Sequence, residues 1–169
     1  MKIITDRMTT ARAEGVVVFL IGMRINRWWK IHRWLPVALA MQRMLRELRG
    51  RPGSGFLGAS LLPGFSVQYW ESLDALLAYA ADRSGQHFPA WADFYKRVGT
   101  NGDVGIWHET YAAPAGAFES MYVNVPPTGL GRYVPLVPAR GHLARARTRL
   151  TTARPEASLP APSEAPAEA

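Results

Sequence analysis

The sequence has 169 residues, of which 48% are hydrophobic and 20% are charged, and its 20 Lys and Arg against 13 Asp and Glu give a formal net charge of +7. This length and composition are typical of one soluble domain with short appendages that buries a hydrophobic core without disulfide cross-links. Cysteine is absent, which excludes disulfides, thiolate nucleophiles and cysteine-based metal sites.

The first predicted element is a strand at Val16–Ile25, which follows a polar lead-in over residues 1–14. Its β-branched, apolar sequence favours a central strand. The near-apolar run is too short for a membrane-spanning helix, which needs about 20 residues. Acidic residues precede the run and no cleavage pattern follows it, so we expect no export signal and a cytoplasmic protein.

An amphipathic helix is predicted to begin at Pro36 and to stop at Gly50, with apolar residues on one side and arginines on the other. Residues 26–34, before this helix, are predicted to form a loop or short turn.

The middle of the chain predicts a hairpin and two helices. The segments Phe56–Leu62 and Phe65–Trp70 flank a Pro-Gly turn and predict two paired strands. Ser72 is suited to cap a helix at Leu73–Ala81, and Pro89 can open another that ends near residue 99.

Alternation of side chains predicts two last strands, Val104–Ala112 and Phe118–Val125. The order β-α-β-β-α-α-β-β predicts an α+β fold, with a ferredoxin-like antiparallel sheet that carries helices on one face. The other sheet face needs a cover, and a homodimer that closes two sheets into a barrel would provide it. We expect this domain to span residues 15–131.

The C-terminal part differs in composition. Residues 132–154 form a basic, Arg- and Ala-rich segment, of which 141–153 could form a helix. Residues 155–169 consist mostly of Pro, Ala, Ser and Glu, and we expect them to be disordered because they carry too little apolar content to fold.

The charge is unevenly distributed along the chain. Residues 1–51 carry +8, residues 52–131 carry −4 and residues 132–169 carry +3. A basic first third could attract anionic lipid, nucleic acid or an acidic ligand, or simply form solvated faces. We expect no nucleic-acid partner, because no nucleic-acid-binding motif occurs and the body of the predicted barrel is acidic.

Two histidines are the leading candidates for chemistry. His87 lies at the break between two predicted helices, and His108 lies inside a predicted strand, on the same face as Ile106 and Thr110. Imidazole titrates near neutrality, so His108 is either an acid, base or ligand facing a pocket, or a buried imidazole that its surroundings hydrogen-bond.

Three stretches, Gly15–Trp29, Val67–Trp70 and Gly105–Tyr111, resemble domain-of-unknown-function family 4188, a bacterial family often labelled monooxygenase-like, over about residues 8–131. That family is similar to dimeric α+β barrel proteins, which include heme-containing aldoxime dehydratases and heme-free antibiotic-biosynthesis monooxygenases. The resemblance implies the barrel fold and a homodimer more directly than any reaction.

Part of the chain also resembles the C-terminal half of aldoxime dehydratases, at Ser72–Ala80, His87, Trp91–Phe94 and Trp107–Glu109. This resemblance implies that His87 is the axial ligand of a heme iron and that His108, 21 residues later, is the distal acid and base. Aldoxime dehydratases carry two related barrel halves in one chain, whereas this chain has room for one. A structural or polar-loop role for His87 stays open.

Polar residues near strand ends are further candidates. Arg24, as a catalytic anion-binding group, and Asn26 end the first strand, where they could line a pocket mouth or simply reach solvent. The last predicted strand offers further substrate-pocket groups, at Ser120, Tyr122 and Asn124.

The tryptophans Trp28, Trp29 and Trp34 interleave with basic residues. We expect them to pack at a barrel rim or dimer interface with cation–π contacts, and we do not expect membrane contact.

These features predict a small oxidoreductase- or lyase-like enzyme that acts on a hydrophobic small molecule in a barrel pocket. Its reaction would be aldoxime-dehydratase-like, with heme, or monooxygenase-like. The alternatives are a non-catalytic small-ligand or heme-binding barrel and, more weakly, a membrane-interfacial protein that uses the Trp and Arg cluster.

Overall fold

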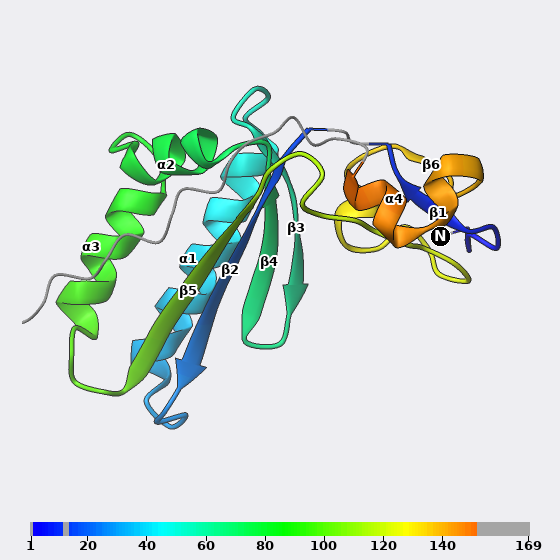
Figure 1. Ribbon diagram of the computed structural model, residues 1–169. Helices are drawn as coiled ribbons and strands as arrows, with labels where there is room; N and C mark the ends of the chain where they lie inside the picture. Colours follow the sequence, from blue (N-terminus) through cyan, green and yellow to red (C-terminus); the bar gives the residue numbers. More distant parts are fainter. Residues whose placement is uncertain (1, 12–13, 152–169) are drawn as a thin grey trace, which may run out of the picture.

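The computed structural model describes residues 2–11 and 14–151, and its largest unit is a four-stranded antiparallel sheet (Figure 1). The strands lie in the order β3-β4-β2-β5, with bounds β2 Val16–Ile25, β3 Phe56–Leu62, β4 Phe65–Trp70 and β5 Val104–Ala113. One helical connection joins β2 to β3 and another joins β4 to β5, so the predicted α+β, ferredoxin-like fold is confirmed.

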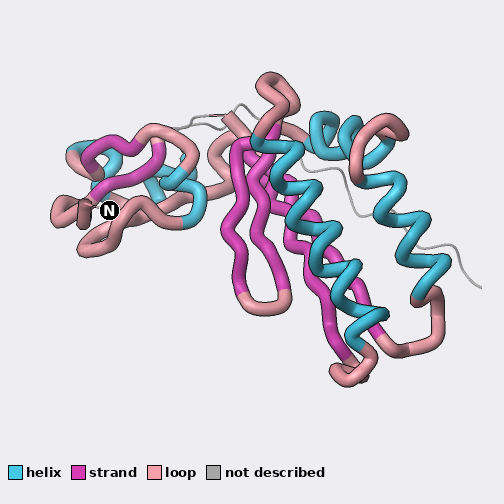
Figure 2. The backbone as a smooth tube through the Cα atoms, turned by 180° about the vertical axis from the view of Figure 1, so that it is seen from behind, coloured by secondary structure: helices cyan, strands magenta, loops and turns pink. Residues whose placement is uncertain are grey.

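Three helices cover one face of this sheet: α1 (Ile31–Arg49), α2 (Leu73–Ala81) and α3 (His87–Arg97). Figure 2 shows α1 in front of the strands with α3 beside it. The core forms where this face meets α1 and α2, and it contains Val17, Leu48, Trp70, Leu76 and Tyr79. Alternation along β4 explains this burial, because Ser66, Gln68 and Trp70 all point toward the helices.

None of the described helices lies over the opposite face of the sheet (Figure 1). Aromatic side chains cover part of this face instead. A Cβ atom on Gly22 would lie 2.5 Å from the Trp107 indole, so Trp107 lies directly across β2, and its ring centroid is 6.0 Å from that of Phe65. At the β3 edge, Tyr133 covers Gly58 in the same way and donates a hydrogen bond to the Ala59 carbonyl (2.6 Å).

A second, smaller unit lies beside β3 (Figure 1). It pairs β1 (Met8–Thr10) with β6 (Leu136–Pro138), and adds two 3-10 turns, η1 (Gly129–Arg132) and η2 (Gly141–Ala144), and the short helix α4 (Ala146–Thr151). Part of the polar lead-in is therefore a strand. The tail predicted to be disordered, 155–169, lies outside the described residues.

The predicted strand Phe118–Val125 is wrong, because this segment does not join the main sheet. It crosses the smaller unit and forms only isolated bridges, Ile4 with Val125 and Met8 with Tyr122. Asn124 has a positive φ of 55°, which breaks a regular strand. This segment pairs with residues of the N-terminal lead-in. Alternation of side chains within the segment does not reveal which part of the chain it pairs with.

Helix starts also differ from the prediction. Helix α1 begins at Ile31, so Pro36 lies inside it, and α3 begins at His87, two residues before Pro89. Each helix begins earlier than predicted because residues outside it stabilise the additional turn. Before α1, the Trp34 indole donates a hydrogen bond to the Trp28 carbonyl (2.8 Å) and fixes the turn that leads into the helix.

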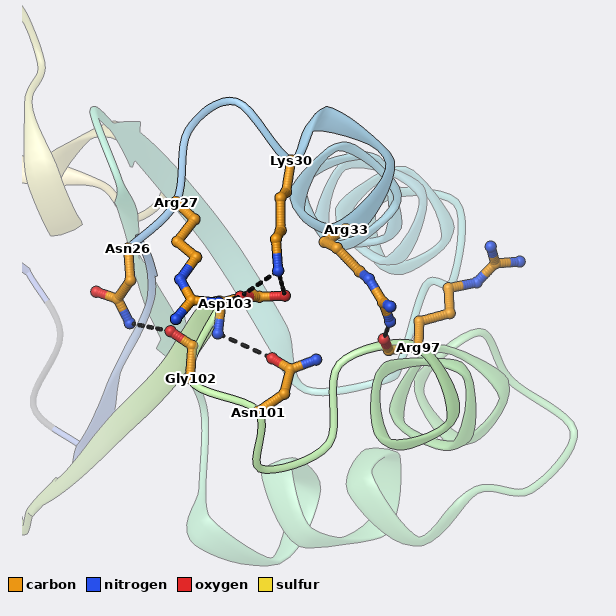
Figure 3. Close-up of polar contacts among 8 residues, drawn as sticks. All are labelled: Asn26, Arg27, Lys30, Arg33, Arg97, Asn101, Gly102 and Asp103. Carbon is orange, nitrogen blue, oxygen red and sulfur yellow. Dashed lines mark hydrogen bonds and ion pairs between the residues drawn. The ribbon is translucent and has the colours of Figure 1, made fainter.

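Asp103 joins this turn to the loop that follows α3 (Figure 3). Its side chain is buried, at 2% exposed, and accepts hydrogen bonds from Arg27 (2.8 Å) and from Lys30 (3.0 and 2.9 Å). Asn26 adds a bond from its side-chain amide to the Gly102 carbonyl (3.0 Å). Two loops far apart in the sequence are thereby tied together at one end of the sheet.

Candidate functional site

A cavity of about 590 Å³ lies between α1, α3 and the helix-covered face of the sheet. This volume lies within the range of small-molecule and cofactor sites. Most of its lining side chains are apolar, among them Ile21, Val37, Met41, Met44, Phe94 and Ile106. The cavity therefore suits a ligand that is largely hydrophobic.

His87 lines this cavity as the first residue of α3. Its Nδ1 atom is buried and has no hydrogen-bond partner among the described residues. Its ring centroid lies 6.0 Å from that of Tyr79, which packs on Trp70 at 5.6 Å. Burial raises the pKa of Tyr79 to about 12, so this neighbour is a neutral phenol at physiological pH.

A polar network fixes the loop that leads into His87. The carboxylate of Glu47, on α1, accepts a hydrogen bond from the backbone N–H of Gln86 (2.8 Å). Arg51 pairs with Asp82 at 2.7 Å and with Glu47 at 3.4 Å. Hydrogen bonds from Ser84 and Arg51 hold the pKa of Asp82 well below its usual range, so this carboxylate stays charged.

Two arginines, Arg43 and Arg97, also line the cavity. The Nε atom of Arg97 pairs with Asp93 at 2.8 Å, one helical turn earlier. Arg43 forms no ion pair with any residue in the described part of the chain. These guanidinium groups can bind a carboxylate of a ligand by charge-assisted hydrogen bonds.

His108 lies on the helix-covered side of β5, opposite Ile21 of β2. Its ring centroid is 5.6 Å from that of Phe19, and the residue is exposed. His108 does not line the cavity, but Ile106, two residues earlier on the same face, does. The structure thus places His108 about 7 Å along the strand from the cavity wall.

The other candidate residues lie elsewhere. Arg24 is on the helix-free sheet face, where its Nε donates to the Asn26 side chain (3.1 Å). Ser120 bonds to Thr10 (3.0 Å) in the smaller unit, and the Tyr122 hydroxyl accepts from the Gly131 N–H (2.9 Å). Asn124 donates its backbone N–H to Ile4 (2.6 Å). None of these five lines the cavity.

Several residues of the cavity wall escape sequence reasoning. Met41, Met44 and Phe94 recur at helical spacing and look like ordinary core residues, and Arg43 looks like part of a solvated face. No signal in the sequence separates these residues from ordinary core or surface residues.

The family model for monooxygenase af470-like proteins matches residues 16–130, which cover the whole sheet and all three of its helices. The chain belongs to this family. The match includes α1, α3 and β5, so the cavity, His87 and His108 all lie within the family domain of this monooxygenase af470-like protein.

Among solved structures, this monooxygenase af470-like protein is similar to an aldoxime dehydratase in complex with butyraldoxime, at a TM-score of 0.62 and 17% identity over 78% of this chain and 41% of that one. A second aldoxime dehydratase gives 0.61 and 18% over 78% and 42%. Each likeness shows the fold. The chain spans about two fifths of these proteins. No curated protein sequence matches it.

Proposed function

We propose that this protein is a small-molecule enzyme whose hydrophobic substrate binds in the cavity between α1, α3 and the sheet, and that the cavity also holds heme. The observation that carries the proposal is the His87 imidazole, which lines an apolar cavity of suitable volume and whose Nδ1 atom has no hydrogen-bond partner among the described residues. Membership of a monooxygenase-like family and the aldoxime dehydratase fold support an oxidoreductase- or lyase-like reaction.

The residues of the cavity fit heme. No group of three or more His, Asp or Glu side chains that could hold a bare metal ion occurs in residues 2–11 and 14–151. Heme needs only one or two protein ligands, and a neutral imidazole such as that of His87 is a common one. The apolar lining suits the porphyrin, and Arg43 and Arg97 can pair with its propionates.

When bound, heme would supply a redox-active iron. The protein's own contributions would be to exclude water with the apolar lining, to orient His87 through the Glu47 network, and to neutralise anionic groups with the two arginines. His108 would exchange a proton with the substrate through an imidazole nitrogen, provided that the substrate extends past Ile106.

We also propose a homodimer, like those of the dimeric α+β barrel proteins, in which a second copy covers the helix-free sheet face. A second copy would cover Trp107 and Tyr111, which are 41% and 55% exposed. Arg24 and Asn26 would then lie at the rim of the space between two sheets. Their role as an anion site depends on that dimer.

Heme reconstitution tests the proposal. Protein expressed with a heme precursor is expected to keep a Soret band through gel filtration, and His87→Ala is expected to lose it. His142→Ala, at an exposed position of the smaller unit, is the matched control and should keep the band. His108→Ala should keep the band and lose turnover of an aldoxime to a nitrile.

A protein without any Soret band would overturn the heme proposal. Oxygen uptake with aromatic or quinol substrates would then test a heme-free monooxygenase in the same cavity.

A non-catalytic ligand-binding barrel is the second candidate, because the exposed His108 stands outside the cavity lining. It predicts saturable binding of a hydrophobic ligand that weakens in Met41→Asp, with no turnover by any assay.

A further inference from the structure

An exposed apolar patch begins in the turn before α1 and continues along that helix. Trp28 and Trp29 are 72% and 60% exposed, and Ile31, Leu35 and Leu39 are 52%, 40% and 43% exposed. The last three recur every four residues, which places them on one side of the helix. We call these five residues the α1 outer patch.

The side chains of the α1 outer patch point away from the core. Ala40, Leu45 and Leu48 are the buried residues of α1 and face the sheet, and none of the described elements covers the opposite side of the helix (Figure 2). Packing of Trp28 and Trp29 at a barrel rim or dimer interface stays a prediction in the described part of the chain. There the two indoles contact each other edge to face, at 6.1 Å between ring centroids.

The same side of α1 carries basic residues toward the C-terminal end of the helix. Counting by 3.6 residues per turn, Arg46 and Arg49 follow Leu39 along the exposed side, and Arg43 lies beside them. None of these three arginines forms an ion pair with another described residue. Residues 24–51 hold eight Lys and Arg and one acidic residue, Glu47. The exposed side of α1 is therefore apolar at its start and cationic toward its end.

An anionic lipid surface would complement both the apolar start and the cationic end of the exposed side of α1. Tryptophan prefers the boundary between headgroups and acyl chains, and amphipathic basic helices bind in that plane. A second copy packed on this side by twofold symmetry would set arginines either against arginines or against the apolar start of the partner helix, so it would leave the arginines without an anionic partner. Nucleic acid would complement the charge, but it offers no apolar phase for Ile31, Leu35 and Leu39.

Contrary to the expectation from the sequence, we propose that the α1 outer patch, together with Arg46 and Arg49, docks this protein on the surface of an anionic phospholipid membrane. Trp28 and Trp29 enter the interfacial layer, and the arginines contact lipid phosphates. None of the described helices has the length and apolarity needed to cross a bilayer.

Co-sedimentation of the full-length protein with vesicles tests the proposal. We expect binding to phosphatidylcholine vesicles that contain about a third phosphatidylglycerol, and little binding to phosphatidylcholine alone. Raising the salt to about 0.5 M should weaken the binding, since it screens the charges.

Two variants test the α1 outer patch and the arginines that follow it separately. Trp28→Ser with Trp29→Ser should lower the partition coefficient roughly tenfold or more. Arg46→Gln with Arg49→Gln should lower it roughly fivefold for each arginine, and only on anionic vesicles.

Matched controls come from other surfaces. Leu73→Ser with Leu77→Ser removes exposed leucines of α2 (41% and 55% exposed), and Arg132→Gln with Arg145→Gln removes exposed arginines of the smaller unit. Both should leave the partition coefficient unchanged. Circular dichroism spectra and thermal melts of all variants separate lost binding from lost folding.

Three outcomes would overturn the proposal. The first is wild-type protein that stays in solution with anionic vesicles. The second is equal binding by the folded Trp28→Ser, Trp29→Ser variant. The third is a change of molar mass in solution on that substitution without vesicle binding, which would assign the patch to a second copy of the chain.

Discussion

The ammonium group of Lys30 donates hydrogen bonds to both carboxylate oxygens of Asp103, at 3.0 and 2.9 Å, across 73 residues of sequence. Arg27 binds the same carboxylate at 2.8 Å (Figure 3). Because Asp103 is buried beneath its two partners, this contact fixes the turn that carries Trp28 and Trp29 at the start of α1.

We expect Asp103→Asn to destabilise the protein, because it leaves two cations facing a neutral amide. The melting temperature should fall by about 5 °C or more. Asp93→Asn, which breaks the half-exposed pair with Arg97 on α3, is the control and should change it much less. Equal melting temperatures for Asp103→Asn and the wild type would contradict the structural role of this contact.

The same contact predicts a pH dependence. The hydrogen bond from Lys30 lowers the pKa of Asp103 below its ordinary value, so the unfolded chain binds the proton more readily. The stabilisation is fully present above the unfolded pKa, near 4, and is lost as the pH falls through the folded pKa. The difference in melting temperature between wild type and Asp103→Asn should be constant near neutral pH and shrink below about pH 4. Thermal melts at fixed ionic strength measure this, and a difference that grows with acidity would refute it.

Ser72 caps α2 by accepting a hydrogen bond from the backbone N–H of Ala75 (3.1 Å). Ser72→Ala should reduce the free energy of unfolding by about 1 kcal/mol, and Ser72→Gly by only a few tenths. Urea denaturation of both variants checks this, and a larger loss in the glycine variant would argue against a capping role.

The two sides of α1 should respond differently to truncation. Leu45 is 1% exposed, so Leu45→Ala should cost about 2–5 kcal/mol of unfolding free energy. Leu39→Ala, on the α1 outer patch, should stay within about 0.5 kcal/mol of the wild type. A comparable loss for both would mean that Leu39 packs against something in solution, and molar-mass measurements would then identify a second copy.

Gly22→Ala should destabilise the sheet by about 1–3 kcal/mol, because the new methyl group would overlap the Trp107 indole. Trp107→Leu makes room, so the double variant should recover part of that loss. Chemical denaturation of both single variants and the double variant gives the coupling energy, and strict additivity would contradict the direct contact.

The sequence predicts the main sheet well, because each of its strands carries its own local signal. β2, β3 and β4 have the predicted bounds, since alternation and turn residues lie within a few positions of one another. The start of α1 depends instead on a tertiary contact, that of Lys30 with Asp103. The segment 118–125 fails as a strand for the same kind of reason, because its partners are lead-in residues more than 100 positions away.

The candidate site is predictable only in part. His87 stands out as a histidine at a helix break, and the structure places it on the cavity wall. The carboxylate of Glu47 binds the backbone N–H of Gln86, the residue before His87. Glu47 lies 39 positions before Gln86 and looks like an ordinary surface acid of α1 in the sequence. The cavity itself gives no sequence signal, because Met41 and Phe94 have the same pattern whether they face a core or a void.

The helix α3 forms one wall of the cavity, yet none of its residues is buried. Polar contacts hold its two ends to α1, through Glu47 at its start and through Arg33, which binds the Arg97 carbonyl, at its end. In amide hydrogen exchange, such an element opens at a lower free energy than strands whose side chains fill the core. The backbone amides of α3 should therefore exchange well before those of β2 and β4. The cavity wall would then loosen while the sheet stays intact.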